Sequence, residues 1–330
     1  MKTVTDLELR PATLDDAALV ADIDTEVHPD DPQDPVLMRH WWSMDADDDV
    51  VERSIVTRGG EPVGFTFFGH PAWSKMPQRF ARLNAELRPG TRDAARLDAL
   101  YVGLEDRARR DETAKVTTWT WEFDVLRIAM LQARGYREER RERFWELDLV
   151  EGRERITKMT GESRERMTRE GIRVLTLAED EDPDRWEKLK RMSDEAESDV
   201  PTTVPHVVFD MGEWMKWFQS PGLRPDRIWI ARAGEGAPGR EATDDIVGIS
   251  MLSYPPVRGV VVTDWTGTAR KVRGRGVARA LKCETLMQAI ALGVDRVRTD
   301  NDSANAPILH INASMGYRRR PDAIQLLKEL

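Results

Sequence analysis

The sequence predicts an α/β fold in which two similar units follow one another along the chain. Both halves show the same predicted order: a strand, two helices, three strands, a helix, a strand, a helix and a last strand. Short segments within each half also repeat at nearly equal spacing. At 330 residues the chain is long enough for two domains of ordinary size. This mixed order of elements indicates sheets with helices on both faces.

Each half begins with a strand followed by a helix. In the first half, Leu7–Arg10 reads as a strand and Thr13–Glu26 as a helix. In the second half, Ile172–Leu177 and Pro183–Glu197 repeat this pair, with Asp182 as the expected helix cap. The similar beginnings predict that the two halves share a fold.

Two pairs of short segments carry the repeat. Val63–Phe65, in a predicted strand after a polar turn, matches Val247–Ile249. Leu131–Tyr136 (LQARGY) matches Ile311–Tyr317 (INASMGY) at almost the same separation along the chain. Similar separations indicate duplication with small changes in the loops. Chance similarity between short hairpins is the alternative.

The repeat divides the chain into a first domain at residues 1–150, a charged segment at 151–171 and a second domain at 172–330. The charged segment is nearly free of large apolar residues, which predicts a solvated helix or linker. The glycine-rich, charged stretch Ala233–Asp245 predicts a mobile hairpin tip.

Composition restricts the classes of function. The net charge of −9 and the pI of about 5.3 argue against nucleic acid as the main partner, because phosphate binding needs a basic face. No stretch approaches the ~20 apolar residues of a membrane span, and Met1–Arg10 contains no apolar run of a signal peptide. The single cysteine, Cys283, excludes an intramolecular disulfide and fits a reducing compartment. We therefore expect a cytoplasmic protein without a membrane partner.

The sharpest local pattern lies in the second half, where a strand, a glycine loop and a helix follow one another. Gly259–Thr268 is an apolar strand, Arg273–Ala278 is the loop, and Arg279–Leu292 has apolar residues at helical spacing. The unpaired amides at a helix N-terminus carry partial positive charge and bind anions. The pattern therefore predicts a phosphate site, and an ordinary basic turn before a helix is the alternative.

The residue types of this loop suit a diphosphate. Gly274 and Gly276 allow the backbone to approach a ligand closely, because they have no Cβ. Arg273 and Arg275 add positive charge in an otherwise acidic protein. A polyanionic cofactor would need such a local site in this chain.

A second polar pattern follows the next strand. The strand Asp295–Thr299 leads into Asn301 and Asn305, and a helix at about Ala306–Met315 ends at Gly316, which suits a left-handed helix C-terminus. The two patterns occur in order, about 40 residues apart, and are joined by a helix and a strand.

Together the two patterns resemble the acetyl-CoA signature of the GNAT (Gcn5-related N-acetyltransferase) superfamily. Arg273–Ala278 is similar to its Arg-x-x-Gly-x-Ala loop, and Thr299–Asn305 and Asn312–Tyr317 are similar to its later asparagine and Gly-Tyr patterns. The full resemblance covers residues 172–330, and residues 1–150 resemble the superfamily in outline. The resemblance implies two tandem GNAT folds, each a mixed, mostly antiparallel sheet flanked by helices.

The resemblance also implies roles for residues of the second domain. The amides of Arg275–Ala278 would hold the pyrophosphate of acetyl-CoA, the strand end at Thr266–Ala269 would separate from its neighbour and pair with pantetheine, and Asn305 would lie beside the cofactor. A backbone amide near Thr268 would polarise the thioester oxygen. The implied cofactor-binding residues are Thr266, Gly267, Thr268, Arg273, Gly274, Arg275, Gly276, Val277, Ala278 and Asn305.

The implied reaction is direct attack of a neutral amine on the acetyl thioester, with a base for the amine proton and an acid for the thiolate. Asp264 is the only carboxylate on the strand before the loop, and alternation puts it on the face of Val262 and Thr266. Asp264 is therefore the predicted base, and a surface or salt-bridged aspartate is the alternative. Asn312 stands where the superfamily usually has an acidic tyrosine. Either Asn312 hydrogen-bonds the thiol or another group protonates it.

Other candidate groups have simpler interpretations. Cys283 and Tyr317 are typical of a core, and His310 is typical of a partly exposed helix position. By the resemblance, the loop Asp199–His206 shapes the acceptor pocket, where its first and last residues can receive a cationic amine; a solvated loop is the alternative. The aromatic residues within 214–218 predict core packing rather than ligand stacking.

The first half lacks most of the signature. Its loop reads Arg88–Arg92, where Pro89 has no amide proton and Gly90 is the only glycine. The helix Phe123–Arg134 lacks the paired asparagines. This copy is predicted not to bind acetyl-CoA in the usual way, and to support the fold or the acceptor pocket instead. An altered cofactor site is the alternative.

The predicted function is transfer of the acetyl group of acetyl-CoA to a primary amine of a small molecule, without a metal. A non-catalytic acyl-CoA-binding or sensor protein is one alternative, and an acyltransferase that uses a different acyl-CoA is another. The expected partners are the small-molecule amine and no nucleic acid, and the expected assembly is a monomer or a homodimer.

Overall fold

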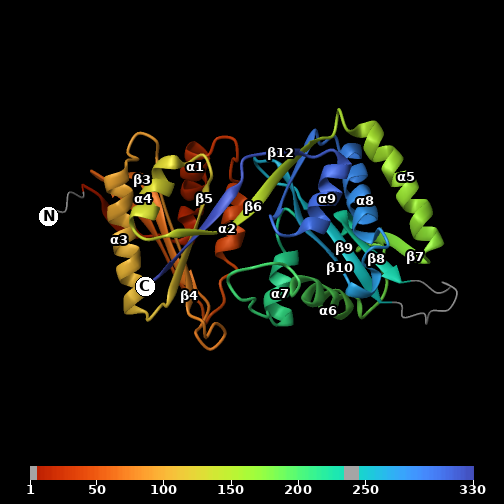
Figure 1. The fold of residues 1–330 in the computed structure, drawn as a ribbon, viewed down its shortest axis with the longest axis horizontal. Coiled ribbons are helices and arrows are strands. Elements are labelled where there is room, and N and C mark those ends of the chain that lie inside the picture. The colour runs from red at the N-terminus through yellow and green to blue at the C-terminus, as the bar shows by residue number, and fades with distance from the viewer. Residues whose placement is uncertain (1–5, 234–244) are drawn as a thin grey trace.

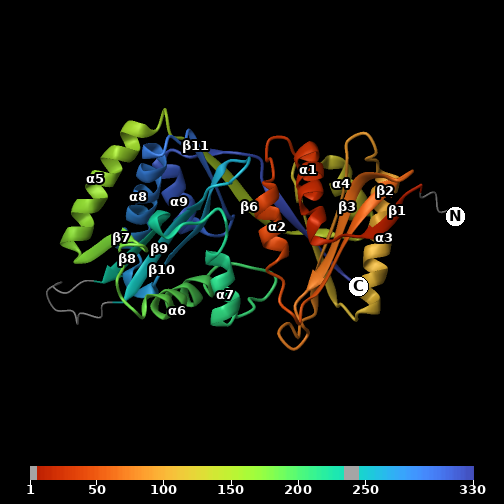
Figure 2. The ribbon, with the colours of Figure 1, turned by 180° about the vertical axis from the view of Figure 1, so that it is seen from behind.

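The computed structural model describes residues 6–233 and 245–330, which form two α/β halves side by side (Figures 1 and 2). The hairpin tip predicted at Ala233–Asp245 lies almost wholly outside these residues. Both halves contain the predicted order of elements. The predicted α/β fold of two similar units is confirmed.

The first half runs from β1 to β6, and the helix α5 connects it to the second half. Its elements are β1 (Glu8–Pro11), η1 (Leu14–Asp16), α1 (Ala17–Val27), α2 (Pro35–Trp42), β2 (Val50–Arg58), β3 (Glu61–His70), β4 (Phe80–Leu87), α3 (Ala94–Arg110), β5 (Lys115–Trp121), α4 (Val125–Ala133) and β6 (Arg137–Asp148). After α5 (Arg153–Arg169) come β7 (Ile172–Thr176), α6 (Arg185–Glu197), α7 (Met211–Phe218), η2 (Pro225–Arg227), β8 (Ile228–Ala233), β9 (Ile246–Ser253), β10 (Val261–Thr268), η3 (Arg270–Val272), α8 (Val277–Ala291), β11 (Arg296–Asp302), α9 (Ala306–Met315), β12 (Arg318–Arg319) and β13 (Ala323–Glu329).

The strands of the described residues join one 13-stranded sheet. Its order is β1-β2-β3-β4-β5-β13-β6-β11-β10-β9-β8-β7, and β12 pairs with β6 beside this path. Most neighbours are antiparallel, whereas β4–β5 and β10–β11 are parallel. The sheet is therefore mixed and mostly antiparallel, as the resemblance implies.

The two halves exchange their last strands. β13, from the end of the chain, lies between β5 and β6 and is antiparallel to both. β6, from the first half, pairs along its other edge with β11 of the second half. Figure 1 shows the blue C-terminal strand running into the red-to-yellow half. The ranges 1–150 and 172–330 thus describe the order along the chain, while each half of the shared sheet contains a strand from the other range.

Each half has its own apolar core. The largest contributions come from side chains that are at most 1% exposed, each worth about 1.5–3 kcal/mol of transfer free energy. They include Phe68, Leu83, Leu97 and Tyr101 in the first half and Ile230, Ile249, Met251 and Leu281 in the second.

The charged segment at 151–171 is a helix, and one of its faces is packed. Ile156, Thr160, Ser163 and Met167 are buried at helical spacing. The Ser163 hydroxyl lies 3.9 Å from the Sγ atom of Cys283 on α8. Because Thr160 and Ser163 interrupt the apolar side chains of this stripe, the sequence did not reveal the buried face.

The predicted start of α6 lies two residues too early. The helix begins at Arg185 with Asp184 as its N-cap. The carboxylate of Asp182 instead accepts hydrogen bonds from Lys188 at 2.7 Å and from the buried Arg232 at 2.8 Å. Asp182 therefore helps to neutralise the buried guanidinium of Arg232 instead of capping the helix.

Over the described ranges, no helix combines the length and the apolar character needed to cross a membrane.

Candidate cofactor and catalytic site

Two glycines in the left-handed region form the turn before α8. Gly274 has a φ of 76°, and Gly276, the N-cap of α8, has a φ of 88°. No side chain of the described residues caps this helix. The amides of its first turn therefore remain available as donors at the positive end of the helix dipole. The turn offers these donors to an anion, as the predicted phosphate loop requires.

β10 leads into this turn and separates from β11 before reaching it. Their parallel pairing covers only Val261 with Val297 and Val262 with Arg298. From residue 263 to 268, one edge of β10 stays paired with β9, and within the described residues no strand pairs with the other edge. We call this separation of the strands beyond Val262 the β10–β11 wedge. An extended chain can pair with such a free edge.

The two arginines of the loop make different contacts. The guanidinium of Arg273 donates to the carbonyl oxygen of Thr268 at 3.3 Å and pairs with Asp199 at 2.6 Å. Arg275 donates to the carboxylate of Glu170 at 2.6 Å and to its carbonyl oxygen at 2.9 Å. Arg275 therefore ties the end of α5 to the loop. Of the two side chains, that of Arg273 is the more exposed, at 41% against 18%.

A third arginine, which the sequence analysis missed, lies at the same turn. Arg166 on α5 donates to the carbonyl oxygen of Gly274 at 3.0 Å. A Cβ atom added to Gly276 would lie 3.1 Å from the Arg166 guanidinium carbon. Because Arg166 precedes the loop by more than a hundred residues, only the packing of α5 against α8 brings it there. Its place in a charged helix was no signal of this role.

The predicted acceptor loop Asp199–His206 makes other contacts. The carboxylate of Asp199 is bound by Arg270 at 2.6 Å as well as by Arg273. The guanidinium of Arg270, followed by that of Arg273, lowers the pKa of Asp199 below its usual range. His206 lies 3.8 Å from Glu197. Asp199 thus ties the end of α6 to Arg270 and Arg273, and two guanidinium groups already neutralise its carboxylate.

A β-bulge at Asp264 changes which residues share a face of β10. The pairing with β9 shifts register between Thr263 and Trp265, which leaves Asp264 as the extra residue. An extra residue inverts the alternation of side chains beyond it. The predicted common face of Val262, Asp264 and Thr266 is therefore wrong.

The carboxylate of Asp264 lies in a poorly solvated position. Its Oδ2 atom is buried, and the described residues offer it no hydrogen-bond partner. Burial raises the pKa of Asp264 to about 6, the indole of Trp217 on α7 favours the charged form, and the carboxylate of Asp300 opposes it. An aspartate with this pKa is mostly ionised at pH 7 and accepts a proton more readily than an ordinary one. The position fits neither an exposed nor a salt-bridged aspartate.

Asn312 is fully buried near the end of α9. Its Nδ2 atom donates to Oδ1 of Asn301 at 2.7 Å, which joins two asparagines of the sequence pattern. Its own Oδ1 atom has no hydrogen-bond partner in the part of the chain that the structure describes. A carboxamide does not ionise, so Asn312 can donate a hydrogen bond but is no acid.

The other candidate side chains lie in the core or at the surface, as expected from the sequence. Cys283 and Tyr317 are buried, and burial raises the pKa of each. His310 is exposed on α9, and Trp214 is buried in the core of the second half. Asn305 is the N-cap residue of α9 and is half-buried.

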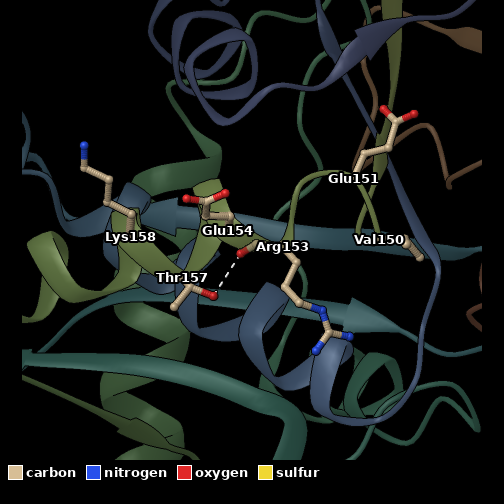
Figure 3. A pocket seen from close by; sticks show the side chains of 6 residues that line it. All are labelled: Val150, Glu151, Arg153, Glu154, Thr157 and Lys158. Atoms are coloured by element: carbon tan, nitrogen blue, oxygen red, sulfur yellow. Dashed lines mark hydrogen bonds between the residues drawn. The ribbon is translucent and has the colours of Figure 1, made fainter.

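A hollow of about 630 Å³ lies at the start of α5 and contains none of these residues (Figure 3). It is lined by Val150, Glu151, Arg153, Glu154, Thr157 and Lys158. The Thr157 hydroxyl donates to the carbonyl oxygen of Arg153 at 2.8 Å, within the helix itself.

Across the described ranges, no group of three or more His, Cys, Asp or Glu residues is placed to hold a metal.

In the first half, the protein itself fills the corresponding places. The carboxylate of Asp93 caps α3 by accepting a hydrogen bond from the Arg96 amide at 2.8 Å. β4 and β5 also pair only at their beginnings. Arg127 on α4, 2% exposed, ion-pairs with Glu86 on β4 and donates to the Tyr101 hydroxyl on α3 at 2.6 Å. The guanidinium therefore occupies the separation between these strands.

Solved structures match nearly the whole chain. A tandem GNAT protein from the clavulanic acid biosynthesis pathway is 16% identical, with 98% of both chains covered and a TM-score of 0.72. A GCN5-related N-acetyltransferase from Sphaerobacter thermophilus is 17% identical, with 98% of this chain and 96% of that chain covered and a TM-score of 0.67. No protein-family model and no curated protein matches the sequence. The chain therefore has the tandem GNAT fold.

Proposed function

We propose that the protein is a GNAT-type N-acetyltransferase that transfers the acetyl group of acetyl-CoA to a primary amine of a small molecule. One observation carries this proposal: the uncapped N-terminus of α8 and the β10–β11 wedge occur together in the second half. The first feature suits a diphosphate, and the second suits an extended pantetheine arm.

The residues around these features fit coenzyme A. The amides from residue 276 to 278 are the proposed diphosphate donors, whereas the Arg275 amide donates to the carbonyl oxygen of Val272 at 3.3 Å. Arg166 and Arg273 border these amides with positive charge. Gly276 leaves room that a Cβ atom would take from Arg166. The free edge of β10, at residues 266–268, is the proposed partner of pantetheine, with Asn305 beside it. Acetyl-CoA supplies an acetyl group activated as a thioester.

Asp264 is the proposed base. Its carboxylate accepts the proton that the amine loses as the nitrogen bonds to the acetyl carbon, directly or through one water. The raised pKa brings this carboxylate nearer to neutrality than an ordinary aspartate. A backbone amide of β10 near Thr268 is the proposed donor to the thioester oxygen.

A non-catalytic acyl-CoA-binding protein is the second candidate function. It is favoured by Asn312, which stands where related proteins usually have an acidic tyrosine and which does not ionise.

For either function we propose a cytoplasmic location, because the only cysteine of the chain is buried beside α5 and takes no part in a disulfide.

Two measurements test the proposal. Isothermal titration with acetyl-CoA should give one site per chain, and thiol release from acetyl-CoA should rise with at least one member of a panel of amino sugars, polyamines and amino acids. Binding without thiol release for any amine would favour the second candidate. Absence of binding would refute the site assignment, and tighter binding of a longer acyl-CoA would revise the donor.

A further inference from the structure

The buried lysine of α8 is unexplained by the packing around it. Lys282 is 2% exposed. Its ammonium lies 5.3 Å from the centre of the Tyr317 ring, and it makes no ion pair with any residue that the structure describes. A buried ammonium without an ion pair is costly, because burial favours the neutral form. The packing of the protein alone therefore does not explain a charged Lys282.

Several polar atoms around the Tyr317 ring are also incompletely hydrogen-bonded. The Tyr317 hydroxyl, the Thr263 hydroxyl and Oδ1 of Asn312 are buried, and none of them makes a hydrogen bond of regular geometry within the described chain. The Thr263 hydroxyl lies close enough to that of Tyr317 to favour its ionised form. Thr263 is the first residue of β10 beyond its pairing with β11, so it marks the apex of the β10–β11 wedge. Native structures rarely leave several buried polar atoms unsatisfied in one place. These atoms can therefore hydrogen-bond to a polar or charged atom of a ligand.

The charges near Lys282 come from three sides. Asp300 on β11 and the neighbouring thiol of Cys283 favour its charged form, and the Tyr317 ring presents its face to the ammonium. Asp264 on β10 lies within electrostatic reach of Asp300. Burial outweighs these effects and lowers the pKa of Lys282 to about 8. The ammonium form still predominates at pH 7.

We propose that the ammonium of Lys282 donates the proton that the sulfur of coenzyme A takes up when the thioester bond breaks. This inference rests on the proposed acetyl transfer. As the amine nitrogen bonds to the acetyl carbon, the carbon–sulfur bond breaks and its electron pair leaves with sulfur. The Lys282 proton then goes to sulfur, the amine proton goes to Asp264, and both groups are restored by exchange with water.

The chemistry of the leaving group supports a lysine in this place. A thiol has an ordinary pKa of about 8.5, so an ammonium of similar pKa transfers its proton at little cost. Asn312 cannot make this transfer, since its amide does not ionise. Lys282 therefore supplies from α8 the acid that α9 lacks.

The test uses free coenzyme A and needs no acceptor. The ultraviolet absorbance of the thiolate is followed as the pH is raised, for saturating coenzyme A bound to the full-length protein and to Lys282→Met, each with its coenzyme A-free protein as blank. The bound thiol should titrate about 1 unit lower in the wild-type protein than in the variant, because a nearby cation stabilises the thiolate. Lys158→Met, on the exposed side of α5, is the control and should behave as wild type.

The outcomes separate this inference from the function it rests on. Equal thiol titration in wild type and Lys282→Met, with equal coenzyme A binding, would overturn the role of Lys282 and leave the acetyltransferase proposal standing. If wild type binds no coenzyme A, the proposed function itself fails. Lys282→Gln gives the same comparison if the methionine variant does not fold. With any amine that the panel identifies, kcat of wild type should fall above about pH 8, and this fall should be absent in Lys282→Gln.

Discussion

The helices α3 and α8 follow equivalent strands in the two halves, but their N-termini are completed differently. Asp93 caps α3 with its own carboxylate, while Gly276 leaves the first turn of α8 without a side-chain cap. Unpaired amides at a helix N-terminus need an acceptor in either case. In the first half the Asp93 carboxylate accepts from the Arg96 amide, and its negative charge opposes a diphosphate at this helix end. In the second half the amides of the first helical turn remain free for a ligand.

The separated strand pairs of the two halves, β4–β5 and the β10–β11 wedge, also differ in what lies between the strands. Both parallel strand pairs separate, so the separation belongs to the fold itself. In the first half the separation holds the guanidinium of Arg127 with its partner Glu86. In the second half the corresponding helix, α9, has the sequence APILHINASM and contains no lysine, arginine or carboxylate. We therefore propose that a separated strand pair alone makes no cofactor site, and that the helix cap and the side chain between the strands decide whether a ligand can enter.

The largest expected effect comes from removing the guanidinium of Arg127 that lies between β4 and β5. Arg127→Met should lower the free energy of unfolding by about 3–5 kcal/mol, because it removes the closest cation of the buried Glu86 and leaves this carboxylate with His28 at 3.7 Å and Arg92 at 3.9 Å. Guanidinium denaturation measures this loss. The double variant Arg127→Met/Glu86→Gln should recover most of it. An unchanged unfolding free energy in the single variant would show that the guanidinium is not needed between β4 and β5.

The next effect comes from giving the N-terminus of α8 a side-chain cap. Gly276→Asp should raise the Kd for acetyl-CoA at least about 100-fold, or about 2.7 kcal/mol, because the carboxylate repels the diphosphate and competes for its amides. Isothermal titration measures the change. Gly90→Asp, in the equivalent loop of the first half and with open space around its Cβ, is the matched control and should leave the Kd unchanged. Weaker binding in Gly90→Asp would place the cofactor in the first half.

Asp264 affects turnover rather than binding. Asp264→Asn should lower kcat about 100-fold, the usual range for loss of a general base, with little change in the Kd for acetyl-CoA. In the wild-type protein kcat should fall as the pH drops below about 6, since protonation removes the base, and the variant should lack this dependence. Asp226→Asn, an exposed position on η2, serves as control. An unchanged acid limb in the Asp264 variant would assign the base to another group.

The smallest effect concerns the arginine contributed by α5. Arg166→Met should raise the Kd for acetyl-CoA about tenfold, or about 1.4 kcal/mol, through loss of one cation beside the diphosphate. Arg169→Met, on the same helix and 70% exposed, should leave the Kd unchanged. Equal effects of the two variants would mean that α5 contributes only its general positive charge.

The local parts of the site could be predicted from the sequence. A strand, the glycines Gly274 and Gly276, and a helix start are coded within one short stretch, because backbone conformation at glycine and helix initiation depend on neighbouring residues. Each of these predictions needs only contacts between adjacent elements.

The sequence pattern did not predict features that depend on strand register or on packing between distant segments. The bulge that isolates Asp264 depends on how β10 pairs with β9, and alternation along a single strand contains no information about that partner. The exchange of β6 and β13 depends on which of two similar edges each strand meets.

By itself, the sequence determined that two similar α/β units follow one another and that the second carries a glycine turn before a helix, since propensity and spacing act over a few residues. Tertiary structure decided which side chains reach that turn and the wedge beside it. Arg166 reaches the turn from α5, and Lys282 lies against the Tyr317 ring, although the patterns of their own helices signal only charge or burial. Their positions follow from the packing of α5, α8 and α9 on one shared sheet, a non-local outcome that no short stretch of sequence encodes.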